Sequence, residues 1–327
     1  MITRFRVGLR LQRFEIVVVS IVVAVLAGSA LVVRARLDGL GVTSACLAAW
    51  FGSGAPADPC TSDPASPALV FQTISVGDAS MVLLVMAVIP LVVGMFLGVG
   101  LVAREIEGGT APTMWALARS RSRWLAGRLL PPLLGAAALL ALLAVTSEIL
   151  WAGQAPWEPA LRFDEAGLHG PVVVAKGLAA FGVASLVGAV LGRSLPAFIV
   201  ATLLVWLGLA GTGTVARTFW MQAEAQHHVV LVDPNATHIA FPGGTMTSMG
   251  WRTADGRDLD WQTAWEMVPA GEPDPDAWLA AHMTGIYWGV PGTMYPTWNA
   301  IETAGYGAIA LGAIGATFLV VRVRRPF

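Results

Sequence analysis

The chain has 327 residues, of which 56% are hydrophobic and only 13% are charged, and its formal net charge is −1. An ordinary soluble domain carries about a quarter charged residues, so this composition excludes a normal water-facing surface. The mean hydropathy of +0.67 accompanies long apolar runs between clusters of charge, a pattern typical of repeated bilayer spans.

Six apolar segments are long enough to cross a bilayer. The stretch before the first, 1–13, interleaves arginines with apolar residues and predicts either an amphipathic helix on the inner leaflet or a basic flank that only sets topology. The first span is expected to be retained, because its apolar run is longer than that of a signal peptide and no clear cleavage site follows. The predicted spans are residues 14–33, 80–103, 129–151, 172–191, 195–213 and 304–321.

The charged residues between the spans fall into two sets that alternate along the chain. One set comprises both tails, the loop 104–128 and Arg193, and it holds 13 arginines and three acids, net +10. The other set holds 7 basic and 18 acidic residues, net −11, and the two sets add up to the −1 of the whole chain. Because basic residues accumulate on the cytoplasmic side, both termini are predicted to be cytoplasmic.

The longest segment on the predicted outer side, 214–303, is too long to lack structure of its own. Asp255-Gly256 separates two short runs with strand character, which predicts a hairpin, and 275–282 has the pattern of a short helix. Seven of the 13 tryptophans fall in this segment, and tryptophan favours the membrane interface, so we expect a small mixed α/β cap resting on the outer leaflet. Cys46 and Cys60 share an earlier outer loop, where they either form a disulfide or remain two free thiols.

The loop between the second and third spans carries the most informative pattern. Gly108-Gly109 permits a sharp turn where the second span ends, and Thr110 is a suitable cap for a short helix running to about Ala118. The predicted helix would present an apolar contact surface formed by Met114, Trp115, Leu117 and Ala118. The bland alternative is an arginine-rich loop that merely obeys the positive-inside rule.

This loop resembles the corresponding loop of ABC exporter permeases of the second class, which include drug, antibiotic and polysaccharide exporters. In those proteins an acidic residue, a Gly-Thr step, a short coupling helix and a Ser-Arg pair precede the third span. The matching residues here are Glu105 or Glu107, Gly109-Thr110, Met114 to Ala118, Ser120-Arg121, Trp124 and Gly127-Arg128. The segment between the last two spans departs from the pattern, since it is much larger than the small re-entrant hairpin often found there.

The resemblance implies that a helix at about 106–118 couples the chain to an ATPase, with Arg121 anchoring the loop to lipid or to the partner. The residues expected to carry this coupling are Glu105, Glu107, Gly109, Thr110, Met114 and Trp115.

The ATPase is expected on a separate chain. A phosphate-binding loop needs Gly-Lys followed by Ser or Thr, whereas the only lysine, Lys176, follows Ala175 and precedes Gly177. The chain is therefore expected to be a transport subunit without a cofactor of its own, while ATP and Mg²⁺ bind two copies of an ABC ATPase. Because six spans are half of the usual twelve, a second copy of this chain is expected to complete a homodimer.

Three ionisable residues, Glu148, Lys176 and Glu302, fall at similar depth near the outer ends of the third, fourth and sixth spans. Ionisable groups within spans are candidates for function, so a Glu148–Lys176 pair with Glu302 nearby is predicted to latch an outer gate. The alternative is that each side chain reaches the outer headgroups by itself.

A rival function is a membrane-embedded enzyme or metal-binding protein whose site lies in the cap and uses histidine and aspartate. All the histidines lie in predicted outer segments, but their spacing matches no named metal motif, so no metal site is expected. These residues are His169, His227, His228, His238 and His282.

The sequence thus predicts an all-α membrane protein: a basic N-terminal segment (1–13), five spans with a coupling helix (14–213), an extracellular cap (214–303), and a sixth span with a basic tail (304–327). The predicted function is the permease of an ATP-driven exporter that moves an amphipathic small molecule, lipid or peptide. Its partners would be the ATPase, the second permease copy and lipid, with no nucleic acid. The excess of arginine over lysine suggests a GC-rich bacterial genome, and hence a bacterial plasma membrane.

Overall fold

The computed structural model of the chain describes residues 13–43, 66–118, 120–154, 163, 167–231 and 244–324. Most of the predicted N-terminal segment and the possible Cys46–Cys60 disulfide lie outside these ranges. Within them, six helical segments are long and apolar enough to cross a membrane, which confirms the six predicted spans. The chain is therefore a multi-pass membrane protein.

The spans are assembled from eleven helical elements. Three spans are single helices: α2 (Arg13–Gly39), α7 (Arg121–Gln154) and α8 (Pro171–Leu191). The second span joins α4 (Pro67–Ile74), the π-helical turn η1 (Ser75–Ala79) and α5 (Ser80–Glu107). The fifth joins α9 (Ser194–Leu203), the π-helical turn η2 (Leu204–Ala210) and α10 (Gly211–Ala225). The sixth joins the 3-10 turn η3 (Gly292–Met294) and α13 (Tyr295–Val323).

Most helices extend beyond the predicted spans. The two largest differences are at the start of the second span, which begins at Pro67 instead of residue 80, and at the end of the fifth, where α10 continues to Ala225 although the apolar run ends at Gly213. Apolarity marks only the part of a helix that suits lipid, while backbone hydrogen bonding continues into polar sequence, so hydropathy underestimates helix length.

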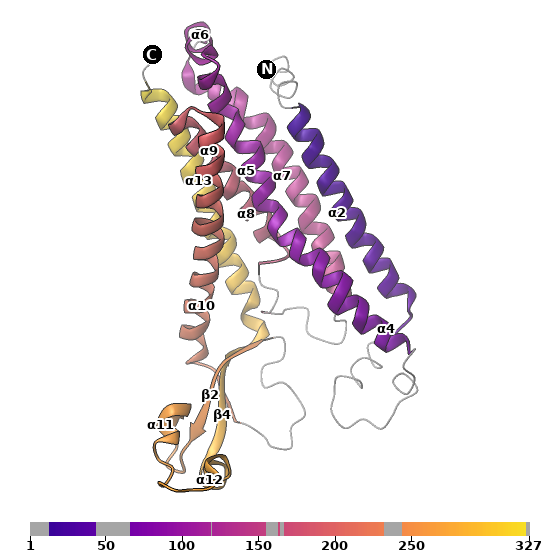
Figure 1. Cartoon of the computed structure of the whole chain (residues 1–327), viewed down its shortest axis with the longest axis vertical. Helices are drawn as coiled ribbons and strands as arrows, with labels where there is room; N and C mark the ends of the chain where they lie inside the picture. Colours follow the sequence, from indigo (N-terminus) through magenta and orange to yellow (C-terminus); the bar gives the residue numbers. More distant parts are fainter. Residues whose placement is uncertain are drawn as a thin grey trace.

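Helix α8 occupies the centre of the bundle and packs against α5, α7, α9 and α13. Within its most apolar stretch 72% of the residues are buried, compared with 28% for α2 and 22% for the fifth span, which lie on opposite sides of the bundle (Figure 1). Small residues allow this close packing: a Cβ at Gly98 of α5 would lie 2.6 Å from the carbonyl oxygen of Phe181, and one at Gly182 would lie 2.9 Å from that of Ala310.

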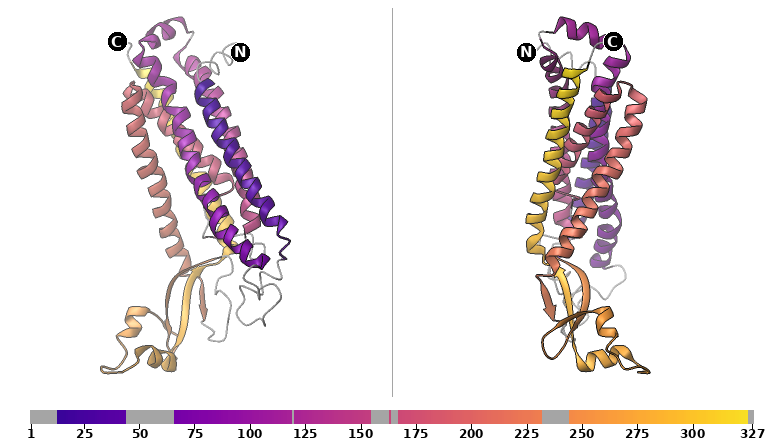
Figure 2. Two further views of the ribbon diagram at one scale, coloured as in Figure 1. Left: turned by 45° about the vertical axis from the view of Figure 1, so that its right-hand side comes forward. Right: turned by 90° about the vertical axis from the view of Figure 1, so that its left-hand side faces the viewer.

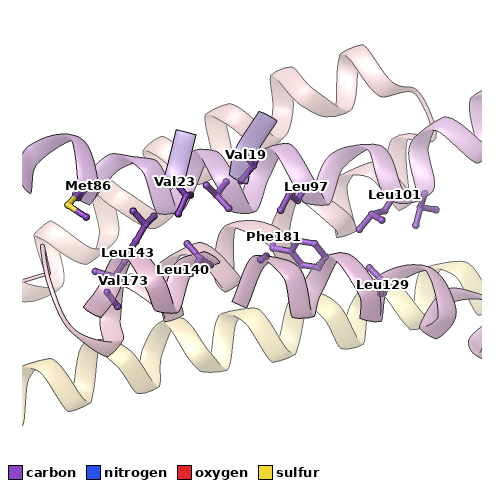
Figure 3. Packing of buried hydrophobic residues seen from close by; sticks show 14 of the residues in the cluster. Val19, Val23, Met86, Leu97, Leu101, Leu129, Leu140, Leu143, Val173 and Phe181 are labelled. Carbon is purple, nitrogen blue, oxygen red and sulfur yellow. The ribbon is translucent and has the colours of Figure 1, made fainter. Parts of the chain in front are cut away.

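The largest cluster of buried apolar side chains joins α2, α5, α7 and α8. Phe181 of α8, Leu97 of α5 and Leu140 of α7 belong to it and are fully buried or nearly so (Figure 3). Because lipid tails are as apolar as these side chains, the cluster stabilises the bundle mainly through close packing rather than through transfer out of water.

The two π-helical turns each receive a hydrogen bond from another span. Gln154 Nε2 donates to the carbonyl oxygen of Ser75 in η1 at 2.9 Å, and Tyr306 Oη donates to that of Leu209 in η2 at 3.0 Å. A π-turn leaves carbonyl groups without their usual partners, so these side chains stabilise the local widening of the helix.

The start of α2 and the end of α13 lie at the same end of the bundle, together with the short helix α6 (Thr110–Leu117) (Figure 1). The opposite end carries a four-stranded antiparallel sheet in the order β1-β4-β2-β3. We call these the α6 end and the cap end, and the views in Figure 2 agree on their positions.

The sheet at the cap end comprises β1 (Val229–Leu231), β2 (Thr245–Arg252), β3 (Asp258–Asp260) and β4 (Thr284–Val290), accompanied by α11 (Trp261–Trp265) and α12 (Pro275–His282). Trp251 pairs with Leu259 across the β2–β3 hairpin, and Gly256 in its turn has a φ of 85°. The sheet projects from the ends of α10 and α13 along the long axis of the bundle instead of folding back over the helices (Figure 1).

Candidate functional site

The α6 end is the first candidate site. Arginines gather here at the ends of α2, α5, α7 and α13 and in the turn between α8 and α9, whereas acids are few, and each acid has a partner within the chain. The arginines of the described chain at this end are Arg13, Arg104, Arg121, Arg123, Arg128, Arg193, Arg322 and Arg324. The acids are Glu15, Glu105 and Glu107.

Helix α6 follows a sharp turn at the end of α5. Gly109 takes a left-handed conformation with φ 66° and occupies the N-cap position, which a glycine adopts without strain. Thr110 is the first residue of α6, and its hydroxyl donates back to the carbonyl oxygen of Glu105 at 3.1 Å. The expectation that Thr110 caps α6 is therefore wrong: its side chain satisfies the end of the preceding helix, because the turn places it beneath that carbonyl.

One face of α6 packs inward. Trp115 is 8% exposed, and its ring makes an edge contact with Trp124 of α7 at 6.0 Å between centroids. The guanidinium of Arg121 lies 5.0 Å from the centre of the Trp115 ring, within the range of a cation–π interaction. Trp115 thus attaches α6 to the bundle. The sequence had placed it in the apolar contact surface of this helix, whereas in the structure its ring packs inward.

The other face of α6 is exposed. Met114 is 36% exposed and Leu117 is 79% exposed, and Thr113 and Ala116 are exposed beside them. A protruding helix with two large apolar side chains outward is a surface on which another protein can dock.

The sequence predicted that Arg121 anchors the loop to lipid or to the partner. In the structure its guanidinium points toward the end of α13 instead. Its Nη1 donates to the carbonyl oxygen of Arg324 at 2.6 Å and lies 3.3 Å from that of Arg322. These carbonyls belong to the last turn and the C-cap residue of α13, where no intrahelical partner remains, so a cation there is favourable. Arg121 therefore ties the α6 loop to the end of the sixth span.

Carboxylates tie the remaining helix ends together. Glu105 forms an ion pair with Arg128 at the start of α7, and Glu15 of α2 forms one with Arg104 of α5. Glu107 Oε2 accepts hydrogen bonds from the amide and hydroxyl groups of Ser194, at 2.9 and 2.6 Å. The acids that the resemblance singled out thus connect the turn before α6 to α7 and α9.

The cap end holds the second candidate site. Lys176 Nζ lies 3.0 Å from Glu302 Oε1 and donates to the carbonyl oxygen of Gly167 at 2.9 Å. Glu148 Oε1 lies instead 3.1 Å from His169 Nδ1, so the predicted Glu148–Lys176 pair is wrong, and the partner of Lys176 is Glu302. All three predicted residues do lie at this end. Residues 167–170 lie between them, with His169 next to Glu148 and Gly167 next to Lys176.

His169 is the central residue that sequence reasoning missed. It is 2% exposed, it stacks between the rings of Trp151 and Tyr295, and its Nε2 lies 3.1 Å from Tyr295 Oη. The residues Gly167–Gly170 are thereby held to three spans, and we call this segment and its partners the outer clip.

The remaining histidines do not assemble. Of the described ones, His228 lies 3.5 Å from Glu224 and His282 stacks on Trp278, while His238 lies outside the described residues. Within the described ranges no group of three or more His, Cys, Asp or Glu is arranged to hold a metal.

The geometry defines a class: a multi-pass membrane protein with an arginine-rich end, a protruding amphipathic helix tied to several spans, and a separate folded element at the opposite end. Comparison with family models gives a match over residues 16–217 to the family described as ABC-2 membrane transporter related. This match covers more than half of the chain, so the chain belongs to that family and is an ABC-2 type permease, a transport subunit rather than an enzyme. Searches of curated proteins and of solved structures gave no match.

The matched region contains the first four spans, α6 and most of the fifth span, including the contacts of Glu105, Glu107 and Trp115. It ends at residue 217, before the sheet and α13. Helix α6 and the contacts that connect it and the turn before it to α7 and α9 therefore lie within the matched region, whereas the cap, Tyr295 and Glu302 belong to the part of the chain beyond it.

Proposed function

We propose that this chain is the membrane subunit of an ATP-driven exporter and that α6 is its coupling helix. The observation that carries the proposal is the position of α6 in a family member: one face is fixed to the bundle through Trp115, and the other exposes Met114 and Leu117. Force applied to this helix passes to α7 through Glu105–Arg128, to α9 through Glu107–Ser194, and to α13 through Arg121.

In this proposal the α6 end faces the cytoplasm and the cap end faces outward. The net +10 of the first charge set supports this orientation, because basic loops stay on the cytoplasmic side. Two ATPase subunits, which bind ATP and Mg²⁺, dock under the α6 helices of two copies of this chain in a bacterial plasma membrane. The cargo is an amphipathic small molecule, a lipid or a peptide.

The outer clip is proposed as the outward gate. Residues Gly167–Gly170 contact Glu148 of α7, Lys176 of α8 and Tyr295 of α13, so these spans separate at the cap end only if the clip opens. Movement of α6 on ATP binding by the partner would be transmitted to the gate along the same helices.

Site-specific crosslinking tests the proposed coupling surface. The chain carrying Leu117→Cys, with Cys46 and Cys60 replaced by serine, is expressed with a candidate ABC ATPase from the same genome and treated with a short thiol-to-amine crosslinker. We expect a crosslinked permease–ATPase product from Leu117→Cys and none from Gln262→Cys, which lies on α11 at the cap end. Equal crosslinking from both positions, or from neither, would contradict the proposal.

Transport itself is measured with both proteins in vesicles, by following ATP-dependent movement of a fluorescently labelled phospholipid. The expected result is flux that requires both proteins and that stops when the catalytic glutamate of the ATPase is replaced. Metal-dependent turnover by this chain alone would favour the rival enzyme.

A further inference from the structure

A small cavity lies at the cap end of the membrane-spanning region, between α5, α8, the fifth span and α13. Its volume is about 240 Å³, below the roughly 300–1,000 Å³ typical of sites for whole drug-sized ligands. The lining is apolar on the α5 side, at Ala87, Val88 and Leu91, and polar on the opposite side, at Lys176, Arg217 and Glu302. A site of this size accommodates a polar head group rather than an entire amphiphile.

The cavity is situated at an unusual point of the backbone. Trp206 and Ala210 belong to the π-helical turn η2, and Tyr306, which stabilises that turn, also lines the cavity. Trp206 is 37% exposed, so the rim reaches the outer surface of the bundle. Single π-turns within α-helices are frequent at functional sites, and this one widens the helix beside the cavity.

The carboxylate of Glu302 is only half satisfied. Its side chain is 8% exposed and Lys176 binds its Oε1, but its Oε2 has no hydrogen-bond partner among the described residues. Two neighbouring polar atoms of α13, Asn299 Oδ1 and Thr303 Oγ1, are also buried and have no hydrogen-bond partner among the described residues. A buried charged acceptor without a donor is costly, which indicates that a donor arrives from outside the chain.

The charges that line the cavity indicate the chemical class of the ligand that would carry this donor. Lys176 and Arg217 contribute two positive charges against the single negative charge of Glu302. A simple cation would meet a net positive surrounding, whereas a head that carries its own phosphate offers a bidentate partner for the guanidinium, whose five donors allow several contacts at once.

We propose that this cavity binds the head group of a phosphate-containing amphiphile that also carries an N–H or O–H donor for Glu302 Oε2. The acyl chains remain at the rim beside Trp206, on the surface of the bundle. This amphiphile would be the cargo of the proposed exporter. Its role as cargo rests on the proposed function, whereas its binding needs this chain alone.

The test compares three dioctanoyl lipids on the purified chain in detergent, with bound lipid counted by native mass spectrometry. Phosphatidylethanolamine and phosphatidylglycerol carry head-group donors, whereas phosphatidylcholine has the same phosphate and no donor. We expect at least one donor-bearing lipid to bind about tenfold more tightly than phosphatidylcholine, the usual value of one hydrogen bond to a charged group.

Glu302→Gln identifies the acceptor. The glutamine oxygen remains directed at the Lys176 ammonium and its NH₂ group replaces Oε2, so the preference for donor-bearing lipids should disappear. Glu224→Gln is the matched control, because Glu224 lies on α10 beside His228 and outside the cavity, and it should retain the preference.

A second variant keeps the test decisive if Glu302→Gln fails to fold. Ala210→Leu adds side-chain volume to the cavity wall and leaves Lys176 and Glu302 unchanged, and it should weaken binding of all three lipids. Equal binding of the three lipids to the wild-type chain, no binding at all, or unchanged binding to Ala210→Leu would overturn the proposal. Loss of ATP-driven flux with the lipid preference intact would instead count against the exporter function alone.

Discussion

Glu107 and Ser194 are 87 residues apart in the sequence, yet Glu107 Oε2 accepts hydrogen bonds from both the amide and the hydroxyl of Ser194, at 2.9 and 2.6 Å. Ser194 is the first residue of α9, so a carboxylate from the end of α5 caps the start of another span. A negative charge is favourable at a helix N-terminus, and this contact joins the turn that carries α6 to the fifth span.

Replacement of Glu107 should therefore uncouple rather than unfold the protein. In Glu107→Ala the chain should fold and reach the membrane, since the carboxylate is exposed, but ATP-dependent flux in vesicles with the ATPase should fall severalfold. Glu107→Asp, one methylene shorter, should recover part of the flux. Unchanged flux in Glu107→Ala would show that the α5–α9 contact transmits nothing.

The two faces of α6 should respond differently to truncation. Trp115→Ala removes a buried aromatic side chain with its edge contact to Trp124, and such truncations cost about 3 kcal/mol or more, so a lower melting temperature is expected in detergent. Leu117→Ala removes an exposed side chain and should leave the melting temperature unchanged while it weakens co-purification of the ATPase. The opposite assignment of the two effects would mean that α6 docks through its other face.

The Lys176–Glu302 pair should be more costly to break than to remove. Lys176→Met alone leaves a buried carboxylate, and breaking such a pair typically costs about 3–5 kcal/mol. The double variant Lys176→Met/Glu302→Leu replaces both charges with apolar groups and should regain most of that stability. Thermal unfolding of the two variants measures the difference. If the double variant is as unstable as the single one, the pair stabilises the bundle through more than charge compensation.

The same double variant separates structure from function. If the outer clip is a gate, flux should remain low even though stability returns, because the gate has lost the Lys176 ammonium that holds Gly167. Full flux in a stable double variant would argue that the clip is only structural.

Close packing of α5 against α8 should make Gly98 intolerant of any side chain. A Cβ there would lie 2.6 Å from the carbonyl oxygen of Phe181, so Gly98→Ala forces the helices apart, and overpacking of this kind typically costs about 1–3 kcal/mol. Gly135 of α7 is the control, because an added Cβ would meet nothing within 4 Å. Gly135→Ala should be neutral or slightly stabilising, in thermal unfolding of the detergent-solubilised chain.

The cap should resist mild acid and loosen only under stronger acid. The hydrogen bonds from Arg252 to Asp258, one of them 2.9 Å long, lower the pKa of that carboxyl, and the backbone amide and hydroxyl of Thr263 lower the pKa of Asp260. A carboxyl whose pKa is lower in the folded state stabilises the fold above its ordinary value of about 3.9 and loses that effect as the pH falls through the lowered pKa. Loss of cap structure is therefore expected below about pH 4, and not between pH 5 and 7.

Fluorine NMR of fluorotryptophan-labelled protein can follow this transition at Trp261, whose ring neighbours those of Trp251 and Trp265. Asp260→Asn is the matched variant, because asparagine caps a helix as well as aspartate but does not titrate in this range. Its acid transition should be smaller, whereas a transition centred near pH 6 in either protein would contradict the assignment to these aspartates.

Local and periodic features were readable from the sequence. Six apolar runs determine six spans, since each helix satisfies its own backbone and needs only length and apolarity to suit lipid. The same holds for Gly108-Gly109, which turns the chain before α6, and for Asp255-Gly256, around which β2 and β3 pair. The distribution of charge between the ends of the spans predicted an orientation for the same reason, because it depends on composition and not on contacts.

Only the tertiary structure decided which residues meet. Lys176 pairs with Glu302, Glu148 lies next to His169, and Ser194 donates to Glu107. Trp115 packs inward, and Arg121 points toward α13. Hydropathy states how deep a residue lies in a span but not which side of the helix it occupies, and the choice among several partners at one depth depends on the packing of α8 between its neighbours. The sequence by itself therefore determined a six-span protein with an arginine-rich α6 loop, while the bundle decided how that loop, the outer clip and the cavity at Glu302 are built.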